Sequence, residues 1–234
     1  MLCIVSMVAA YLLGAVPFGL IIARAHHIDL RKIGSGNIGA TNVSRALGKQ
    51  WGYLCFGLDM LKGLIPTLMA LWWLKPVMVR SGAGETAFLW VWLGTGCAAI
   101  AGHVLPIYVR FKGGKGVATS FGVALGLWPY FTLCAGAALV VWLITLQVWR
   151  YVSLASILAS AAFPIFLFLA IACIRTWSMA HLWPLAIVAL AIPCMVVIRH
   201  RENIRRLRTG TEHKIKTRDR GPLDQGHHRT ERAR

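Results

Sequence analysis

The stretch VATSFGVALGLWPYFTLCAGAALVVWLITLQV, residues 117–148, decides how many times this chain crosses a membrane. It carries no charged residue and is much longer than the roughly 20 residues that one helix needs to cross a bilayer. Pro129 lies in its middle, between Trp128 and Tyr130, and a proline removes a backbone N–H and breaks or kinks a helix. We therefore predict two shorter helices, at about 117–127 and 130–148.

Five more apolar runs flank this stretch, and 57% of the 234 residues are hydrophobic, which does not suit a soluble domain. The sequence therefore predicts an all-α integral membrane protein with seven transmembrane helices. The N-terminus has no charged leader region and no obvious cleavage site, so we expect the first run to be a retained span. The other five runs are residues 2–24, 51–74, 86–109, 152–174 and 178–199.

Basic residues orient these spans, because cytoplasmic loops of membrane proteins carry an excess of lysine and arginine. With seven crossings and an outer N-terminus, the opposite, outer loops receive only Lys75, Arg80, Arg175 and Glu85. With six crossings, the basic C-terminal segment would lie on the opposite side of the membrane from the first two basic loops, against the expected charge bias. We therefore predict a cytoplasmic C-terminus and one cytoplasmic face that gathers the C-terminal segment with Arg31, Lys32, Arg45, Lys49, Arg110, Lys112, Lys115 and Arg150.

The C-terminal segment contains 12 of the 25 lysines and arginines, counted from Arg199 onward. It has no interleaved aromatic residues and no recognisable nucleic-acid-binding fold, so we exclude nucleic acid as a partner and expect contact with lipid headgroups. We predict one polytopic domain over residues 1–210 and a basic, disordered cytoplasmic tail over 211–234. The six cysteines are scattered through apolar runs, which is typical of small packing residues.

Two glycine-rich polar stretches interrupt the apolar pattern, and the first is GSGNIGATN at residues 34–42. It fits GxGxxG, but no strand precedes it and another membrane span follows, so a dinucleotide fold is excluded. Glycine backbone and nearby donors can seat a phosphate. Turn formation is the alternative. The candidate phosphate ligands are Gly34, Ser35, Gly36, Asn37, Gly39, Thr41, Asn42 and Arg45.

The second stretch, FKGGKG at residues 111–116, places two lysines just before a predicted helix N-terminus. It lacks the glycine spacing and the Ser or Thr of a phosphate-binding P-loop. A helix N-terminus favours anions, so Lys112, Gly113, Gly114, Lys115 and Gly116 are candidate phosphate ligands. The alternative is a basic flank that only sets the membrane orientation.

Other polar residues lie in or beside the spans. Asp59 and Lys62 share one helix face, so they are candidates for the site; the alternative is a structural ion pair. His103 is also a candidate, and the alternative for it is a packing role. Ser153 starts a span, where a hydroxyl is also a common helix cap. His200 and Asn203 lie three residues apart beyond the last span, so we expect one face and a histidine base.

Several other chemistries are missing from the sequence. Neither a pair of nearby carboxylates nor a His/Cys/Asp cluster with metal-ligand spacing is present, so we predict no metal and no cofactor. No histidine has an aspartate five positions later, as in acyltransferases with soluble donors, and no GxSxG elbow occurs. An anionic organophosphate is the expected ligand, handled by an enzyme or, alternatively, by a membrane carrier.

Taken together, six segments resemble the bacterial acyl-phosphate:glycerol-3-phosphate acyltransferases, which are integral membrane enzymes. The resemblance extends from the first span to Glu212, with Ile38 where the family usually has proline and Leu105 where it often has an aromatic residue. The segments are 34–42 with Arg45, 58–63, 102–106, 111–119, 153–156 and 200–203.

The resemblance implies acyl transfer from an acyl phosphate to the 1-hydroxyl of glycerol 3-phosphate, giving lysophosphatidic acid and phosphate for phospholipid synthesis. It implies a multi-pass protein of the bacterial plasma membrane with its site at the cytoplasmic face, in contact with lipid and with the enzyme that supplies acyl phosphate. The expected site residues are Ser35, Arg45, Lys115, Ser153, His200 and Asn203. We expect His200, oriented by Asn203, to take the proton or to position a substrate phosphate that does so, and Ser35 or Ser153 to stabilise the oxyanion.

Overall fold

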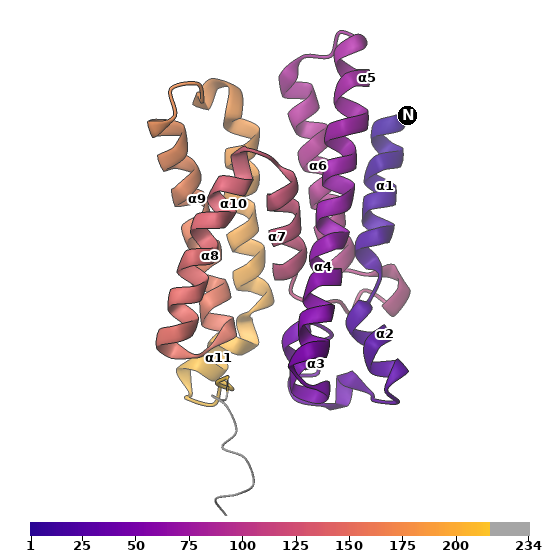
Figure 1. Cartoon of the computed structure of the whole chain (residues 1–234), viewed down its shortest axis with the longest axis vertical. Helices are drawn as coiled ribbons and strands as arrows, with labels where there is room; N and C mark the ends of the chain where they lie inside the picture. The colour runs from indigo at the N-terminus through magenta and orange to yellow at the C-terminus, as the bar shows by residue number, and fades with distance from the viewer. Residues whose placement is uncertain (216–234) are drawn as a thin grey trace, which may run out of the picture.

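A computed structural model describes residues 1–215, and within this range every regular element is helical (Figure 1), as predicted. The short helices are η1 (Leu30–Lys32), η2 (Ala70–Leu74) and η3 (Ile107–Val109). The longer helices are α1 (Leu2–Ala15), α2 (Phe18–Ala25), α3 (Ala40–Leu47), α4 (Lys49–Met69), α5 (Lys75–Arg80), α6 (Glu85–Val104), α7 (Val117–Gly126), α8 (Tyr130–Trp149), α9 (Val152–Cys173), α10 (Met179–Arg199) and α11 (Arg201–Arg208).

Six segments of residues 1–215 are long and apolar enough to cross a membrane: Leu2–Ala25, Lys49–Arg80, Glu85–Val109, Tyr130–Trp149, Val152–Cys173 and Met179–Arg199. The chain is therefore an integral membrane protein with several spans. The predicted break at Pro129 is confirmed, since α7 ends at Gly126 and α8 begins at Tyr130. With 10 residues, α7 covers only about half of the hydrocarbon core.

The first predicted span is not one continuous helix. It divides into α1 and α2 at Val16 and Pro17. Pro17 has no backbone N–H to continue the hydrogen-bond ladder, whereas the N–H of Phe18 donates to the Val16 carbonyl. The break exposes that same carbonyl to a side chain from another helix, described below.

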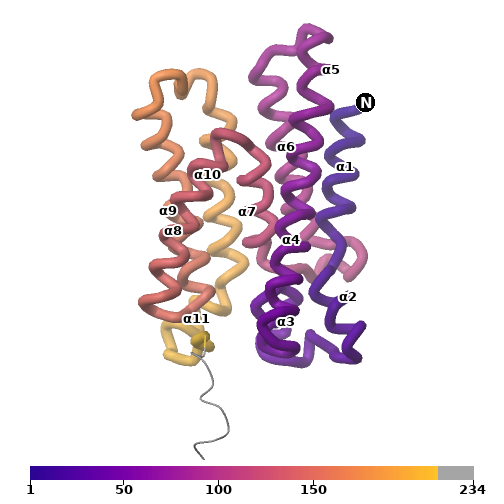
Figure 2. Tube along the Cα trace, in the orientation of Figure 1, coloured from indigo at the N-terminus to yellow at the C-terminus, as the bar shows by residue number. Residues whose placement is uncertain are grey.

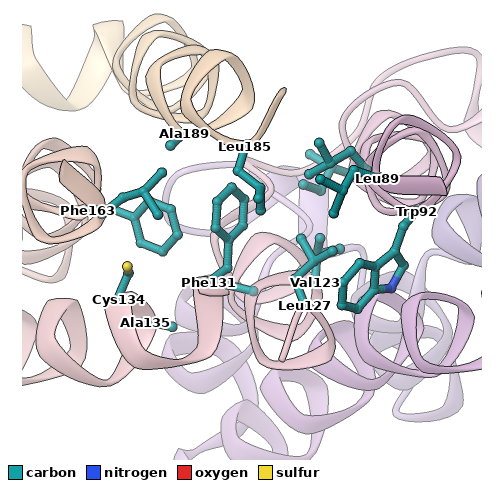
Figure 3. Packing of buried hydrophobic residues seen from close by; sticks show 14 of the residues in the cluster. Leu89, Trp92, Val123, Leu127, Phe131, Cys134, Ala135, Phe163, Leu185 and Ala189 are labelled. Carbon is teal, nitrogen blue, oxygen red and sulfur yellow. The ribbon is translucent and has the colours of Figure 1, made fainter. Parts of the chain in front are cut away.

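The short helix α7 lies between two groups of long helices, with α1, α4 and α6 on one side and α8, α9 and α10 on the other (Figures 1 and 2). Buried apolar side chains join the groups (Figure 3). Phe131 follows the break at Pro129 and packs edge-on against Phe163, with ring centroids 5.0 Å apart. Trp92 from α6 and Leu185 from α10 belong to the same core.

Glycines allow the closest helix contacts, as small residues commonly do in membrane proteins. A Cβ atom on Gly63 of α4 would overlap the Thr119 carbonyl, and one on Gly122 of α7 would overlap backbone of α4. The pair Gly14 and Gly102 does the same for α1 and α6. The contacts of Gly63 and Gly122 hold the first turns of α7 against α4, immediately after the second glycine-rich loop.

The polar segments lie at one end of the bundle, opposite the N-terminus (Figure 1). This end carries α2, α3, the loop before α7, the α8–α9 turn and α11. The connections whose basic residues were predicted to share one face therefore lie at the same end. Hydrogen bonds described below link the loop before α7 and the start of α9 to the segment that follows α10.

The prediction of a disordered tail over residues 211–234 does not hold for its first five residues. Residues 211–215 are described and pack against the bundle: Glu212 is buried, and the N–H of Ile215 donates to the Arg150 carbonyl. Charge and polarity suggested a solvated segment, but Glu212 finds three hydrogen-bond donors in the folded chain. The rest of the predicted tail, residues 216–234, lies outside the described range.

Candidate active site

A buried carboxylate organises the polar end of the bundle. Glu212 Oε1 accepts hydrogen bonds from Ser153 Oγ at 2.8 Å and from Asn203 Nδ2 at 2.6 Å, while Oε2 pairs with Arg206 Nε at 2.7 Å. Lys115 Nζ donates to the Oδ1 atom of the same Asn203. One network thus joins the second glycine-rich loop, the start of α9, α11 and the segment after it.

The role of Glu212 was not foreseen from the sequence, where it is one acid in a strongly basic segment. Burial alone would raise the pKa of Glu212, but hydrogen bonds from Arg206, Asn203 and Ser153 together lower it below its usual value. Glu212 is therefore a carboxylate at neutral pH and the counter-charge for the surrounding cations. The sequence offered one signal for this role: Glu212 is an acid within a basic stretch, at the end of the part of the chain that resembles the family.

Replacing Glu212 with Gln is expected to lower the free energy of unfolding by about 2 kcal/mol, since a hydrogen bond to a charged group is typically worth about 1.5–3 kcal/mol. It should also lower the pKa of Lys115, because the Glu212 carboxylate opposes the effect of burial on that lysine. Thermal unfolding in detergent and the pH dependence of phosphate binding would measure both. Glu85→Gln, at the opposite end, is the control, and equal effects of the two changes would contradict this role.

Two further cations, Lys115 and Arg45, lie close enough to Glu212 to interact with its charge. Burial lowers the pKa of Lys115 to about 8, with Glu212 raising it and Arg206 and Arg45 lowering it further. Arg45 is exposed, yet partial burial of its guanidinium, and after it the charge of Arg206, lowers its pKa against the attraction of Glu212. Arg45 on α3 and Lys115 before α7 are therefore electrostatic neighbours. Three cations around one carboxylate leave an excess of positive charge, which an anion can neutralise.

His200 begins the turn between α10 and α11 and is 2% exposed. Its Nδ1 atom lies 2.8 Å from the Val196 carbonyl, which can only accept, so in the neutral ring Nδ1 carries the proton and Nε2 the lone pair. Burial, and after it the charge of Lys115, lowers the pKa of His200 to about 4, so the ring is neutral at pH 7.

The predicted orientation of His200 by Asn203 is wrong. Asn203 bonds Lys115 and Glu212, whereas the carbonyl of Val196, one turn earlier, holds the histidine. The spacing of three residues placed His200 and Asn203 on neighbouring positions of a helix. It could not show that the chain bends between α10 and α11 and that Asn203 meets a partner from another segment.

Ser153 and Ser35, the two predicted oxyanion donors, differ in the hydrogen bonds that they already make. The Ser153 hydroxyl already donates to Glu212, so in this structure it positions the carboxylate. Ser35 is half-buried, and its backbone N–H donates to Asn42 Oδ1, so its hydroxyl is one of the polar groups that the first loop can offer to a ligand.

Much of the first loop is bonded to itself, which corrects the predicted role of Asn42. Asn42 is 1% exposed; its amide nitrogen donates to the carbonyls of Leu30 and Ile33 and its oxygen accepts from Ser35 N–H. Asn42 therefore shapes the loop and has no donor left for phosphate.

Some of the backbone N–H groups that were expected to bind phosphate also donate to other atoms of the same loop. The N–H of Gly36 donates to the Ile33 carbonyl, and that of Gly39 donates to Asn37 Oδ1. Gly34 and Gly36 have positive φ angles of 57° and 66°, which glycine adopts without strain. Thr41, in the first turn of α3, is exposed. The loop thus consists of a self-bonded turn that presents Ser35, Thr41 and Arg45.

The second loop uses its glycines for close packing. Added Cβ atoms on Gly113 or Gly114 would overlap His103, and Gly114 N–H donates to the His103 carbonyl. The carbonyls of both glycines accept hydrogen bonds from Arg199, the last residue of α10. Gly116, with φ of 83°, then precedes α7. These contacts hold Lys115 toward Asn203.

A second buried charge network lies beneath this loop. Lys62 Nζ is 2.7 Å from Asp59 Oδ1 and donates to the Val16 carbonyl at the α1–α2 break, and His103 Nδ1 is 3.6 Å from the same Asp59 oxygen. All three charged or titratable side chains are at most 5% exposed. This network ties α1, α4 and α6 together, as expected of a structural ion pair, and supports Gly114 through His103.

Asp59→Ala is expected to destabilise the protein by about 3–5 kcal/mol, because it leaves the Lys62 charge buried without its partner. The double variant Asp59→Ala/Lys62→Met removes both charges and should be more stable than the single variant. Thermal unfolding in detergent measures both. A double variant that loses the sum of the two single effects would contradict a coupled buried pair.

The fold and the cluster define a class of protein: a multi-span helical membrane protein with a cationic site at one end, built from connections between its spans. The sequence profile of the glycerol-3-phosphate acyltransferases matches residues 4–210. The chain belongs to this family.

Similar proteins agree over nearly the whole chain. The glycerol-3-phosphate acyltransferase of Geotalea daltonii is 46% identical over 91% of this chain and 97% of its own length. The glycerol-3-phosphate acyltransferase of Aquifex aeolicus is 44% identical over 88% of this chain and 95% of its own length. A crystal structure of PlsY, an integral membrane glycerol 3-phosphate acyltransferase, in its glycerol 3-phosphate form has a TM-score of 0.77 at 42% identity, covering 93% of this chain and 97% of that one. A second form, with lysophosphatidic acid, matches with a TM-score of 0.75.

Proposed function

We propose that this protein transfers an acyl chain from an acyl phosphate to the 1-hydroxyl of glycerol 3-phosphate, giving lysophosphatidic acid and inorganic phosphate. The observation that carries the proposal is the network in which Glu212 binds Arg206 directly and Lys115 through Asn203, with Arg45 close enough to interact with the same charges, in a chain of this family. Both substrates bear phosphate, so cations should outnumber carboxylates where they meet, as they do here.

The reaction needs no covalent enzyme intermediate, because an acyl phosphate is an activated mixed anhydride. The glycerol oxygen forms a new ester bond with the acyl carbon, the carbon–oxygen bond to phosphate breaks, and phosphate leaves with that electron pair. Arg45 and Lys115 hold the phosphates and align the reactants, and Ser35 donates to the developing oxyanion. The hydroxyl proton goes to His200 Nε2 or to a substrate phosphate.

An assay with purified protein in detergent tests this function. Palmitoyl phosphate and glycerol 3-phosphate should give lysophosphatidic acid and an equal amount of phosphate, whereas palmitoyl-coenzyme A or palmitoyl acyl carrier protein should give none. A carrier of organophosphates, the alternative function, would form no product from any donor. Product from coenzyme A thioester alone would contradict the proposed donor.

We further propose that α7 counts as a seventh crossing, that the N-terminus faces outward and that the site lies at the cytoplasmic face of a bacterial plasma membrane. The cations of both glycine-rich loops and of α11 support this orientation through the positive-inside rule. Reporter fusions in a bacterial host test it: a cytoplasmic reporter should be active after residue 215, and a periplasmic reporter after Ser81, between α5 and α6. The reverse pattern would contradict the orientation.

A further inference from the structure

A basic cavity lies apart from the network of Lys115, Asn203 and Glu212. It has a volume of about 660 Å³ and is formed by α2, η1 and the segment around η3. Four cations line it against the single carboxylate of Asp29, and none of its lining residues belongs to the network of Lys115, Asn203 and Glu212. The cations are Arg24, Arg31, Arg110 and Lys112. Lys112, predicted from the sequence to bind substrate phosphate, thus lines this cavity.

The backbone around the cavity is held in uncommon conformations. Among the described residues, four non-glycine residues have positive φ angles, and three of them are His27, Arg110 and Phe111, at or beside the cavity. Such a conformation is unfavourable for an L-residue and persists only where its surroundings enforce it. Arg24 from α2, Arg31 from η1 and Arg110 after η3 are exposed and line the same cavity.

Apolar side chains share the lining of the cavity with the cations, although it lies at the polar end of the bundle: Leu20, Ile28, Leu30, Tyr108 and Val109. Tyr108 is 55% exposed, and its chain neighbour Ile107 is 51% exposed. Aromatic and aliphatic side chains beside cations are typical of the level where lipid headgroups meet hydrocarbon. A molecule with a phosphate group and an apolar chain matches both parts of this surface.

We propose that this cavity is a second phosphate-binding site, separate from the reaction centre, and that its cations and apolar lining together fit it to an anionic membrane lipid. The volume is in the usual range for small-molecule sites. Arginines suit phosphate because their planar groups can form paired hydrogen bonds with its oxygens. A free phosphate ester shares this chemistry, and the experiment below separates the two sources.

Lipid binding to the intact chain tests the proposal. Native mass spectrometry in detergent would compare dioleoyl phosphatidylglycerol with dioleoyl phosphatidylcholine. The double variant Arg24→Gln/Arg31→Gln should bind phosphatidylglycerol about 30-fold more weakly, since each cation near an anionic surface contributes roughly one kilocalorie per mole. The matched double variant Lys49→Gln/Arg205→Gln removes the same charge from exposed positions elsewhere at this end and should change binding less than about twofold.

Inorganic phosphate forms the second arm, by calorimetric titration and by competition with phosphatidylglycerol. A headgroup site predicts that millimolar phosphate leaves phosphatidylglycerol bound. Phosphate binding that depends on Arg24 and Arg31, with no lipid preference, would assign the site to a soluble phosphate. Equal losses in the two double variants, or no loss in either, would overturn the site. Unchanged thermal unfolding of both variants ensures that folded proteins are compared.

Discussion

Replacing Lys115 with methionine is expected to lower kcat/KM for glycerol 3-phosphate by about 100- to 1,000-fold, the usual cost of removing one preorganised donor from developing negative charge. Methionine is unbranched and matches the lysine side chain as far as its fourth atom, but it lacks the ammonium group. Lys115 is the cation that the second loop delivers to Asn203, where it also meets the fields of Arg45 and Arg206. Initial rates of lysophosphatidic acid formation measure the effect.

Lys49→Met is the matched control, because Lys49 is exposed at the same end of the bundle. It should retain at least half of the wild-type rate. The amount of each variant in purified membranes shows whether Lys115 acts only in membrane insertion. Normal activity of Lys115→Met, or a loss that follows its membrane level alone, would contradict a role in phosphate binding.

The pH profile provides a second signature of Lys115. Its ammonium group loses a proton as the pH rises through about 8, so kcat/KM, which reports the free enzyme, should fall on the alkaline side near that value. Arginine stays charged throughout this range. In the Lys115→Arg variant the alkaline fall near pH 8 should therefore disappear, whatever activity remains.

Replacing His200 with alanine is expected to lower kcat by about 100- to 10,000-fold if its ring takes the proton. With a pKa of about 4, His200 stays neutral at pH 5–8, so Nε2 is available as an acceptor across this range and is lost only as the pH falls through 4. Binding of glycerol 3-phosphate, measured by calorimetry, should change little. A kcat within threefold of wild type would assign proton transfer to the substrate phosphate instead.

The spans were predictable because an apolar run of sufficient length has few alternatives to a membrane helix. Pro129 likewise fixed the break before α8, and the order of spans placed the polar loops at one end. The site was predictable only by residue type. Arg45 and Lys115 were expected at an anion site and lie in one electrostatic cluster.

The side-chain partners that the sequence did not foresee at the site have a common physical cause. A polar side chain can serve a ligand only if the fold has not already used its hydrogen bonds, and sequence does not show that. Asn42 is occupied by its own loop and Ser153 by Glu212, whose position depends on a chain reversal after α11. Asn203 was expected to serve His200 but bonds Lys115 across 88 residues of sequence.

A structure of this protein with glycerol 3-phosphate bound tests the central claim most directly, because it locates the phosphate relative to both loops. The phosphate is predicted to lie within hydrogen-bond distance of Lys115 Nζ and the Arg45 guanidinium, with the 1-hydroxyl turned toward His200. A phosphate seated away from both cations, with Lys115 still bonded only to Asn203, would contradict the proposed reaction centre.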